Sequence, residues 1–253
     1  MDQLVVARRP VDWRHWARVL PRAVLRAVLP SACAVCGGAS DAPVCDACRL
    51  RYTAPSTARC PRCANPVAPA DALLACGVCQ ARQPHFDATL AAVDYTMPLD
   101  QLVLQLKFGG QLALAPWCAR TMVDALLARP QFALPELLCP VPLGPLRLRE
   151  RGFNQALEIA RPLARALGIA LLPGLLLRTR ETKAQSSLAP AQRAANIRRA
   201  FVLAPGCEVR DRHVGVVDDV MTSGRTLDEL AATLKRFGAA RVSNLVFART
   251  PPH

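Results

Sequence analysis

The sequence lacks any long hydrophobic run. No stretch of 18 residues is both apolar and free of charge, which argues against a transmembrane helix. The first thirty residues are rich in arginine, but they contain neither the continuous apolar core nor the small-residue cleavage site of a secretory signal. We therefore expect a cytoplasmic protein without a transmembrane segment.

Glycine-rich nucleotide motifs are missing as well. The chain contains no GxxxxGK[ST] sequence and no GxGxxG sequence, which argues against a P-loop nucleotidase and against a Rossmann dinucleotide-binding domain. Aromatic residues make up only 5% of the chain. Few rings are therefore available to stack on nucleobases.

Lysine is scarce, although positive charge is abundant. The 32 basic residues outnumber the 19 acidic ones and give a formal net charge of +13, but the only lysines are Lys107, Lys183 and Lys235. Clustered basic residues bind the phosphates of nucleic acids. A preference for arginine also follows from genome base composition, so charge alone leaves nucleic-acid binding open.

Cysteine, by contrast, is abundant and regularly spaced, because eight of the eleven cysteines form four CxxC pairs. The two thiolates of such a pair face one point, and two pairs complete a tetrahedral zinc site. The sequence predicts two structural zinc ions, with sequential pairing favoured over interleaved pairing because it closes shorter loops. The predicted ligands are Cys33, Cys36, Cys45 and Cys48 for one ion and Cys60, Cys63, Cys76 and Cys79 for the other. A disulfide framework is the competing interpretation, and the missing secretory signal argues against it.

The segment from residue 31 to residue 84 has too few large apolar side chains to bury a core unaided. Structural zinc yields about 10 to 16 kcal/mol in finger peptides, enough to fold such a segment. We favour a structural role over a surface that grips DNA, for which the candidate residues are Arg49, Arg51, Arg59 and Arg62. For the remaining cysteines, Cys118, Cys139 and Cys207, burial as small apolar residues is the default.

Residues 1–30 form a third region. Arginines recur there at every fourth position from Arg14 to Arg26, and apolar residues lie between them at helical spacing. This pattern predicts a basic amphipathic helical segment. We favour docking of its tryptophans on the rest of the protein over contact with a membrane or a nucleic acid.

From residue 88 onward, predicted strands alternate with predicted helices. The strands are expected at 88–96, 136–143, 213–219 and 241–248, and the helices at 99–108, 154–168 and 226–237. This order predicts an α/β domain over residues 85–253 with a mostly parallel sheet flanked by helices. The small zinc domain would span residues 31–84.

The stretch "VGVVDDVMTSGRT", residues 214–226, carries the strongest functional signal. Asp218 and Asp219 follow a buried strand, and ligands bind at the carboxyl ends of parallel strands. The small hydroxyl residues that come next lead into a helix, for which Thr226 and Glu229 have the spacing of a capping box. Such a helix start binds phosphate, while paired carboxylates suit vicinal hydroxyls and a divalent cation. The pattern therefore predicts a sugar phosphate with a magnesium-bound pyrophosphate.

This stretch resembles the ribose-phosphate signature of type I phosphoribosyltransferases. Together with "LKFGG" (106–110), "PVPL" (140–143), "RGFNQA" (151–156), "TKAQSSL" (182–188), "RAANIRRAF" (193–201) and the double zinc ribbon, it resembles the ComF family of competence-associated proteins, GntX-like members included. The resemblance covers the chain from about residue 31 to its end.

The resemblance implies a site for phosphoribosyl pyrophosphate with magnesium. Asp218 and Asp219 would be the catalytic pair that holds the ribose hydroxyls. The implied substrate-binding residues are Val220, Met221, Thr222, Ser223, Gly224, Arg225 and Thr226. The side chain of Arg225 has two alternatives, over the bound phosphate or toward solvent.

Residues elsewhere complete the expected site. The turn after Pro140 is where a pyrophosphate loop would lie, and Arg149, Arg151, Asn154 and Gln155 follow it closely. We include Lys107 because a compact ammonium stands out in a chain that otherwise uses arginine, although a helix-end charge is the commoner role. The polar segment 178–199 falls where related transferases carry a lid.

Two hypotheses of function follow. The resemblance favours a protein of DNA uptake or utilisation that handles incoming single-stranded DNA, binds phosphoribosyl pyrophosphate and works with competence or recombination proteins. The alternative is an active phosphoribosyltransferase of nucleobase salvage with purely structural zinc. Since a site that binds phosphoribosyl pyrophosphate without an acceptor would carry the same residues, the motif leaves catalysis undecided.

Overall fold

The computed structural model describes residues 31–54, 58–179 and 200–251. The chain divides into two compact units, Met1–Cys45 and Asp46–His253. The helical segment expected over residues 1–30 lies outside the described residues, as does the expected lid apart from Arg178 and Thr179. The domain boundaries at residues 30 and 84 remain predictions.

The described part of the first unit is a small antiparallel ribbon. Strand β1 (Ser31–Ala32) pairs with strand β2 (Ala39–Ser40). The turn between them passes through Gly37, whose φ of +73° lies in the left-handed region that glycine adopts without strain. This turn carries the first CxxC pair.

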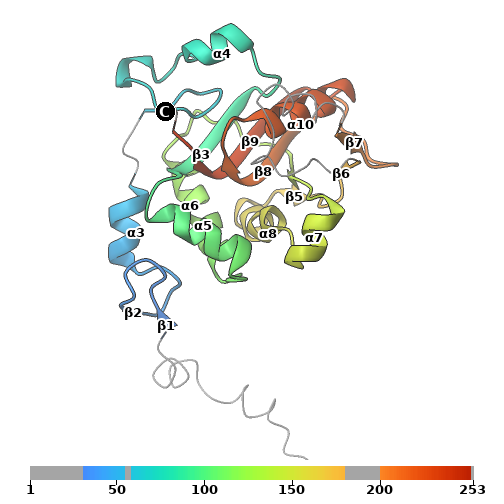
Figure 1. The fold of residues 1–253 in the computed structure, drawn as a ribbon. Helices are drawn as coiled ribbons and strands as arrows, with labels where there is room; N and C mark the ends of the chain where they lie inside the picture. Colours follow the sequence, from blue (N-terminus) through green and yellow to red (C-terminus); the bar gives the residue numbers. More distant parts are fainter. Residues whose placement is uncertain (1–30, 55–57, 180–199, 252–253) are drawn as a thin grey trace, which may run out of the picture. The chain divides into compact units, whose positions relative to one another are not determined.

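The second unit is built around a parallel sheet of five strands (Figure 1). The sheet order is β3-β9-β8-β4-β5, and each neighbouring pair is parallel. The strands are β3 (Ala88–Asp94), β4 (Leu137–Pro140), β5 (Ala170–Leu171), β8 (His213–Met221) and β9 (Arg241–Arg249). A separate antiparallel pair joins β6 (Leu176–Arg178) to β7 (Phe201–Leu203). The predicted α/β class with a parallel sheet is confirmed.

Helices cover both faces of this sheet. One face carries α5 (Leu99–Phe108), α6 (Leu114–Leu127) and α8 (Gln155–Leu167), and the other carries α10 (Arg225–Arg236) (Figure 1). The unit further contains α3 (Asp46–Thr53), the 3-10 turn η1 (Pro69–Asp71), α4 (Gly77–Arg82) and α7 (Pro145–Arg151). None of the helices in the described ranges has the length and hydrophobicity that crossing a bilayer takes.

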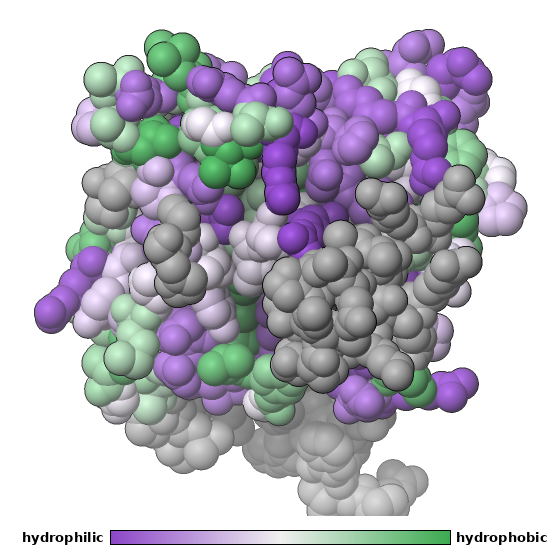
Figure 2. Space-filling view, turned by 45° about the horizontal axis from the view of Figure 1, so that its top comes forward, coloured by the Kyte–Doolittle hydropathy of each residue, from purple (hydrophilic) through white to green (hydrophobic). Residues whose placement is uncertain are grey.

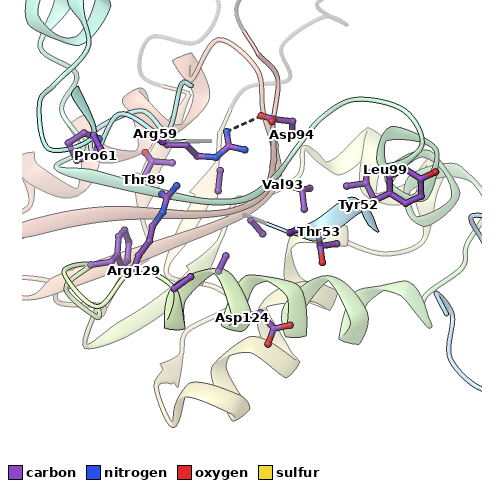
Figure 3. Close-up of a pocket in the computed structure, with 18 of the residues that line it drawn as sticks. Tyr52, Thr53, Arg59, Pro61, Thr89, Val93, Asp94, Leu99, Asp124 and Arg129 are labelled. Atoms are coloured by element: carbon purple, nitrogen blue, oxygen red, sulfur yellow. Dashed lines mark hydrogen bonds and ion pairs between the residues drawn. The ribbon is translucent and has the colours of Figure 1, made fainter. Parts of the chain in front are cut away.

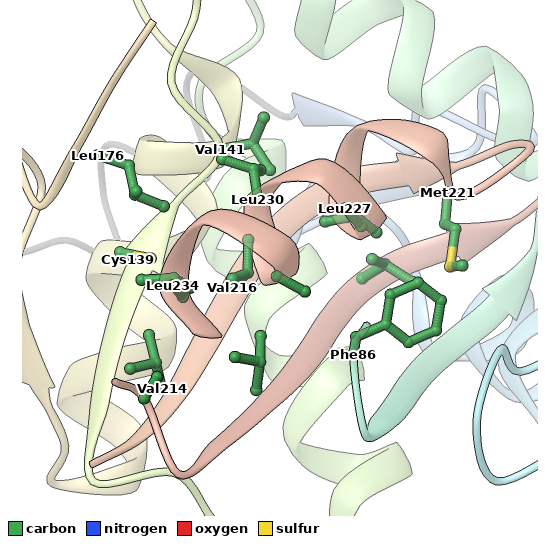
Figure 4. Close-up of a cluster of buried hydrophobic side chains, with 14 of the residues drawn as sticks. Phe86, Cys139, Val141, Leu176, Val214, Val216, Met221, Leu227, Leu230 and Leu234 are labelled. Carbon is green, nitrogen blue, oxygen red and sulfur yellow. The ribbon is translucent and has the colours of Figure 1, made fainter. Parts of the chain in front are cut away.

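Each face of the sheet has its own apolar core. Beneath α10, the buried residues Leu227, Leu230 and Leu234 pack on Val214 and Val216 of β8 (Figure 4). On the opposite face, the rings of Trp117 and Phe247 meet edge to face with centroids 5.7 Å apart. On the face of the protein seen in Figure 2, hydrophilic residues predominate and hydrophobic ones are scattered among them.

Three expectations about the elements are corrected. The strand expected over 213–219 continues to Met221, because Val220 and Met221 still pair with Ala248 and Arg249 of β9. The capping box from Thr226 does not form, since Gly224 at φ +74° is the N-cap of α10 and no side chain caps it. The structure also contains helices α6 and α7, which the alternation of strands and helices had not predicted.

Candidate functional site

The two aspartates lie near the carboxyl end of β8, the middle strand of the sheet, at the edge where the parallel strands β4, β8 and β9 all end. Asp219 is 3% exposed, and its backbone N–H donates to Oδ1 of Asp218 at 2.9 Å. The two carboxyl groups therefore sit close together, with Asp219 buried and Asp218 half-buried. Burial of like charges at this spacing is costly unless a cation or a proton compensates.

Lys107, at the end of α5, supplies the cation. Its Nζ lies 2.5 Å from Oδ2 of Asp219. The other carboxylate oxygen lies 3.4 Å from Nε2 of Gln155, in the first turn of α8, and Oε1 of Gln155 accepts from Arg151 at 2.7 Å. Four of the residues expected at the site thus form one connected network across α5, α7, α8 and β8.

The pKa values of the two carboxyl groups are shifted in opposite directions. Burial and the neighbouring charge of Asp219 raise the pKa of Asp218 well above its usual value. Burial acts in the same direction on Asp219, but Lys107 outweighs it and holds the pKa of Asp219 below its usual value. Asp219 is therefore the ionised member of the pair, and Asp218 is the carboxyl that a cation or a hydrogen-bonding ligand would bring into its charged form.

Asn154 has a structural task at this edge. It is the N-cap of α8, and its Oδ1 accepts from the N–H groups of Ala156 and Leu157 at 3.0 and 3.4 Å. Its Nδ2 donates to the carbonyl of Val141, the residue that follows β4, at 3.0 Å. Asn154 therefore ties the turn after β4 to the start of α8, next to the predicted substrate site.

The expected phosphate loop runs from the end of β8 into α10. The side chain of Met221 is buried against the core beside Phe86 (Figure 4), whereas Thr222 and Ser223 are exposed. Gly224 then turns the chain into the helix, whose first turn presents backbone N–H groups and the positive end of its dipole. Exposed hydroxyls beside a helix start are the donors that a phosphate accepts from.

Two cavities flank these residues. One of about 480 Å³ is lined by Lys107, Phe108 and Arg151, with the guanidinium of Arg151 stacked 5.0 Å from the centre of the Phe108 ring. Another of about 350 Å³ lies between the amino end of α10 and the second cysteine group, where Ser223 and Cys63 are among its lining residues. Of the expected ligand residues, Lys107 and Arg151 line the first cavity and Ser223 lines the second.

A larger cavity of about 890 Å³ lies away from the two aspartates, along β3 and α6. In Figure 3 the guanidinium of Arg59 reaches Asp94 at the end of β3, at 2.9 Å, while Asp124 and Arg129 come from the region of α6. Arg59 is 9% exposed and already paired, and no residue of the 214–226 motif lines this cavity. We assign the functional site to the carboxyl edge of β8 instead.

The eight CxxC cysteines gather into two groups. Within each group all sulfur atoms lie within 4.8 Å of one another. The groups are Cys33, Cys36, Cys45 and Cys48, and Cys60, Cys63, Cys76 and Cys79. This is the sequential arrangement and not the interleaved one.

The spacing of the sulfur atoms fits zinc. A tetrahedral site with zinc–sulfur distances of about 2.3 Å places its sulfurs about 3.8 Å apart. The sulfurs of Cys36 and Cys45 are 3.9 Å apart, and those of Cys63 and Cys76 are 3.6 Å apart. The described cysteines form no disulfide. Both groups therefore have the ligands and the geometry of structural zinc ribbons.

Backbone donors prepare one thiol of each group for metal binding. Burial acts to raise the pKa of Cys33, but N–H groups including that of Cys45, at 3.3 Å, bring this pKa down to about 6. In the second group the N–H of Cys76 donates to the sulfur of Cys60 at 3.3 Å, and the pKa of Cys60 falls to about 7 despite burial. The thiolate is the form that binds zinc.

The arginines considered for DNA contact mostly have intramolecular partners. Arg49 pairs with Asp46 at 3.4 Å, and Arg62 donates to the carbonyl of Phe86 at 3.3 Å. Arg51 lies 5.4 Å from the centre of the Tyr52 ring. Structural contacts therefore explain these side chains without a nucleic acid.

Sequence reasoning missed Arg249, the last residue of β9. Its side chain is 6% exposed and reaches both the second cysteine group and the phosphate loop. No motif in the sequence marks it, because its importance comes from the strand order, which places the end of β9 beside the end of β8.

Comparison with known proteins identifies two domains. Residues 24–80 match the double zinc ribbon domain, and residues 154–252 match the phosphoribosyl transferase domain. A purine phosphoribosyltransferase from Pyrococcus horikoshii aligns with 51% of this chain and 70% of its own, at 19% identity and a TM-score of 0.32. The fold assignment rests on the sheet itself and on the domain match.

Two curated relatives cover most of the chain. The DNA utilization protein YhgH of Salmonella typhimurium is 36% identical over 210 residues, which are 82% of this chain and 90% of that protein. Competence protein F of Haemophilus influenzae is 34% identical over 182 residues, which are 69% of this chain and 78% of that protein.

Proposed function

The chain belongs to the ComF family, and from this membership we propose that it is a cytoplasmic protein of DNA uptake or utilisation whose phosphoribosyltransferase domain binds phosphoribosyl pyrophosphate with magnesium. The observation that carries the proposal is the network of Asp219, Lys107, Gln155 and Arg151 beside the exposed hydroxyl loop. It supplies the charges and donors that such a ligand needs.

The proposed ligand is bound in three parts. Thr222, Ser223 and the first turn of α10 hold the 5-phosphate through hydroxyl and N–H donors. Asp218 and Asp219 accept hydrogen bonds from the ribose hydroxyls. Arg151 and Lys107, at the mouth of the 480 Å³ cavity, face the pyrophosphate. When bound, magnesium neutralises part of the pyrophosphate charge.

The raised pKa of Asp218 supports this assignment. In the free protein its carboxyl is half-buried next to the charge of Asp219, and both effects disfavour the ionised form. A hydroxyl donor or a magnesium ion placed beside it removes the penalty. A carboxyl group whose pKa is raised by burial and a neighbouring charge is typical of functional sites.

The names of the relatives support a role with DNA. If the chain handles single-stranded DNA, its positive net charge and low aromatic content predict weak, sequence-tolerant binding that declines with salt. The salvage alternative has less support, because Phe108, one of two rings near the site, is already stacked with Arg151. Competence or recombination proteins are the proposed partners.

Calorimetric titration tests the proposed ligand. Zinc-loaded full-length protein is titrated with phosphoribosyl pyrophosphate and magnesium, in parallel with an Asp218→Asn/Asp219→Asn variant and with Asp124→Asn as a surface control. Saturable binding by the wild type and the control, lost in the double variant, is expected. A folded, zinc-loaded wild type that binds nothing would contradict the proposal. Fluorescence anisotropy with labelled single-stranded DNA at two salt concentrations tests the second part.

A further inference from the structure

Arg249 makes contacts in two directions from the end of β9. Its Nε donates to the carbonyl of Cys63 at 3.0 Å. Its Nη1 donates to the carbonyl of Met221 at 3.0 Å, and to those of Thr222 and Thr250. A single buried guanidinium therefore joins a ligand residue of the second cysteine group to the first residues of the phosphate loop.

The cysteine side of this contact is electrostatically favourable. A zinc ion neutralises only half of the charge of four thiolates, so a loaded group remains negative. Since Cys63 and Cys79 are themselves buried, Arg249 is a counter-charge in a region that water does not screen.

The loop side of the contact fixes backbone carbonyls. When the carbonyls of Met221 and Thr222 point toward Arg249, the orientation of the following peptide groups is constrained, and these groups lead directly into Gly224 and α10. Arginine suits this position because its planar fork presents several donors at fixed angles, whereas lysine presents a point charge. The loop conformation and the cysteine group thus share one positioning side chain.

We propose that Arg249 couples the second zinc site to the phosphate loop, so that zinc at Cys60, Cys63, Cys76 and Cys79 and phosphoribosyl pyrophosphate at the loop strengthen each other's binding. The inference rests on the proposed function. It gives the second zinc a role in ligand binding beyond folding. Because coupling between two binding sites is reciprocal, it is measurable from either side.

The test measures both sides on the full-length, zinc-loaded chain. Peptide mapping by mass spectrometry follows the alkylation of Cys76, which is partly exposed, with and without phosphoribosyl pyrophosphate and magnesium. Cys36 of the first group is the internal reference. We expect the ligand to slow alkylation of Cys76 by about fivefold or more and to leave Cys36 unchanged.

Two variants locate the coupling. In Arg249→Lys we expect ligand affinity to fall about tenfold and the ligand to lose its effect on Cys76. Arg241→Lys, at the exposed first residue of the same strand, should behave like the wild type. An arginine that only stabilised the fold would lower the melting temperature and leave the ratio of alkylation rates with and without ligand unchanged.

The outcomes separate the two proposals. A wild type that binds phosphoribosyl pyrophosphate without any change at Cys76 overturns the coupling and leaves the proposed function intact. A wild type that does not bind overturns the proposed function and this inference with it. If Arg249→Lys retains full affinity and full protection of Cys76, Arg249 is not the coupling residue. Should that variant fail to fold, the wild-type rates still decide whether coupling exists.

Discussion

The ammonium group of Lys107 lies 2.5 Å from Oδ2 of Asp219. The side chain of Asp219 is 4% exposed and that of Lys107 is 20% exposed, so the pair is largely shielded from water. The chain has only three lysines, and this contact shows that one of them neutralises the carboxylate of Asp219. A compact ammonium reaches a single carboxylate oxygen at the end of a crowded strand, where a guanidinium would bring donors that find no acceptor.

Removing Lys107 should destabilise the protein. Lys107→Ala leaves the Asp219 carboxylate buried without its cation, and we expect the free energy of unfolding to fall by about 3 kcal/mol. Urea denaturation at pH 7 measures the change. Lys235→Ala is the matched control, because Lys235 pairs with Asp87 at 2.8 Å on a more exposed surface and should cost less than about 1 kcal/mol. Equal losses in the two variants would contradict this account.

Substitution of Asp218 and substitution of Asp219 should change the free energy of unfolding in opposite directions. Asp218→Asn removes a carboxyl whose ionisation is unfavourable, and we expect it to stabilise the ligand-free protein by about 1 kcal/mol at pH 7 while weakening ligand binding. Asp219→Asn deprives Lys107 of its partner and should destabilise by about 2 kcal/mol. Thermal unfolding without ligand compares the two variants. Melting temperatures that shift in the same direction in both would contradict the opposite pKa shifts of Asp218 and Asp219.

The pH dependence of stability follows from the same two shifts. The folded-state pKa of Asp218 is raised, so its contribution is complete below about pH 4 and is lost as pH rises toward the folded value. For Asp219 the pKa is lowered, so its contribution is present above about pH 4 and is lost as pH falls below that. The gain in stability from Asp218→Asn should therefore be larger at pH 8 than at pH 5. Urea denaturation at both values checks this order.

Gly224 should tolerate no side chain. Its φ is +74°, and a Cβ would lie 2.6 Å from the terminal methyl carbon of Met221. We expect Gly224→Ala to lower the free energy of unfolding by about 1 to 2 kcal/mol and to weaken phosphate binding by displacing the start of α10. Gly174→Ala, where a Cβ meets no atom within 4 Å, is the control. Denaturation and calorimetry on both variants provide the comparison.

Zinc content should follow the two cysteine groups independently. We expect two zinc ions per chain in the wild type and one in Cys60→Ser, because the other group keeps its four ligands. Cys207→Ser, outside both groups, should retain both ions. Inductively coupled plasma mass spectrometry on freshly purified protein measures the ratio. A wild type without zinc would contradict the assignment of both groups.

The sequence predicted the parts of the site that depend on local pattern. Helix α5 begins and ends at Leu99 and Phe108 as its apolar spacing indicated, and the cysteine groups follow the CxxC spacing. Helix α6 was missed because no side chain caps its start at Ala113 and because apolar residues surround it on most sides. The spacing of Thr226 and Glu229 had indicated that Thr226 would be the N-cap of α10. The N-cap is instead Gly224, which has a positive φ.

Contacts between distant segments were less predictable. In the sequence, Lys107 stood out only because lysine is rare in this chain. Its partner Asp219 could be identified only from the structure, in which α5 packs against the sheet. Arg249 gave no signal at all, since its contacts with Cys63 and Met221 depend on β9 lying next to β8. Strand order decides which ends of strands meet, and alternating hydrophobicity does not specify strand order.

The position of β9 between β3 and β8 has a consequence for biosynthesis. It is the last strand along the described chain, yet it pairs with two strands made before it. While a ribosome is still translating the preceding residues, β3 therefore has no strand to pair with, and its apolar faces stay uncovered until β9 has been made. The cysteine groups, whose ligands are close in sequence, can be metallated long before that. In a nascent chain of this protein the cysteine ligands are thus complete before β3 has its partner strand.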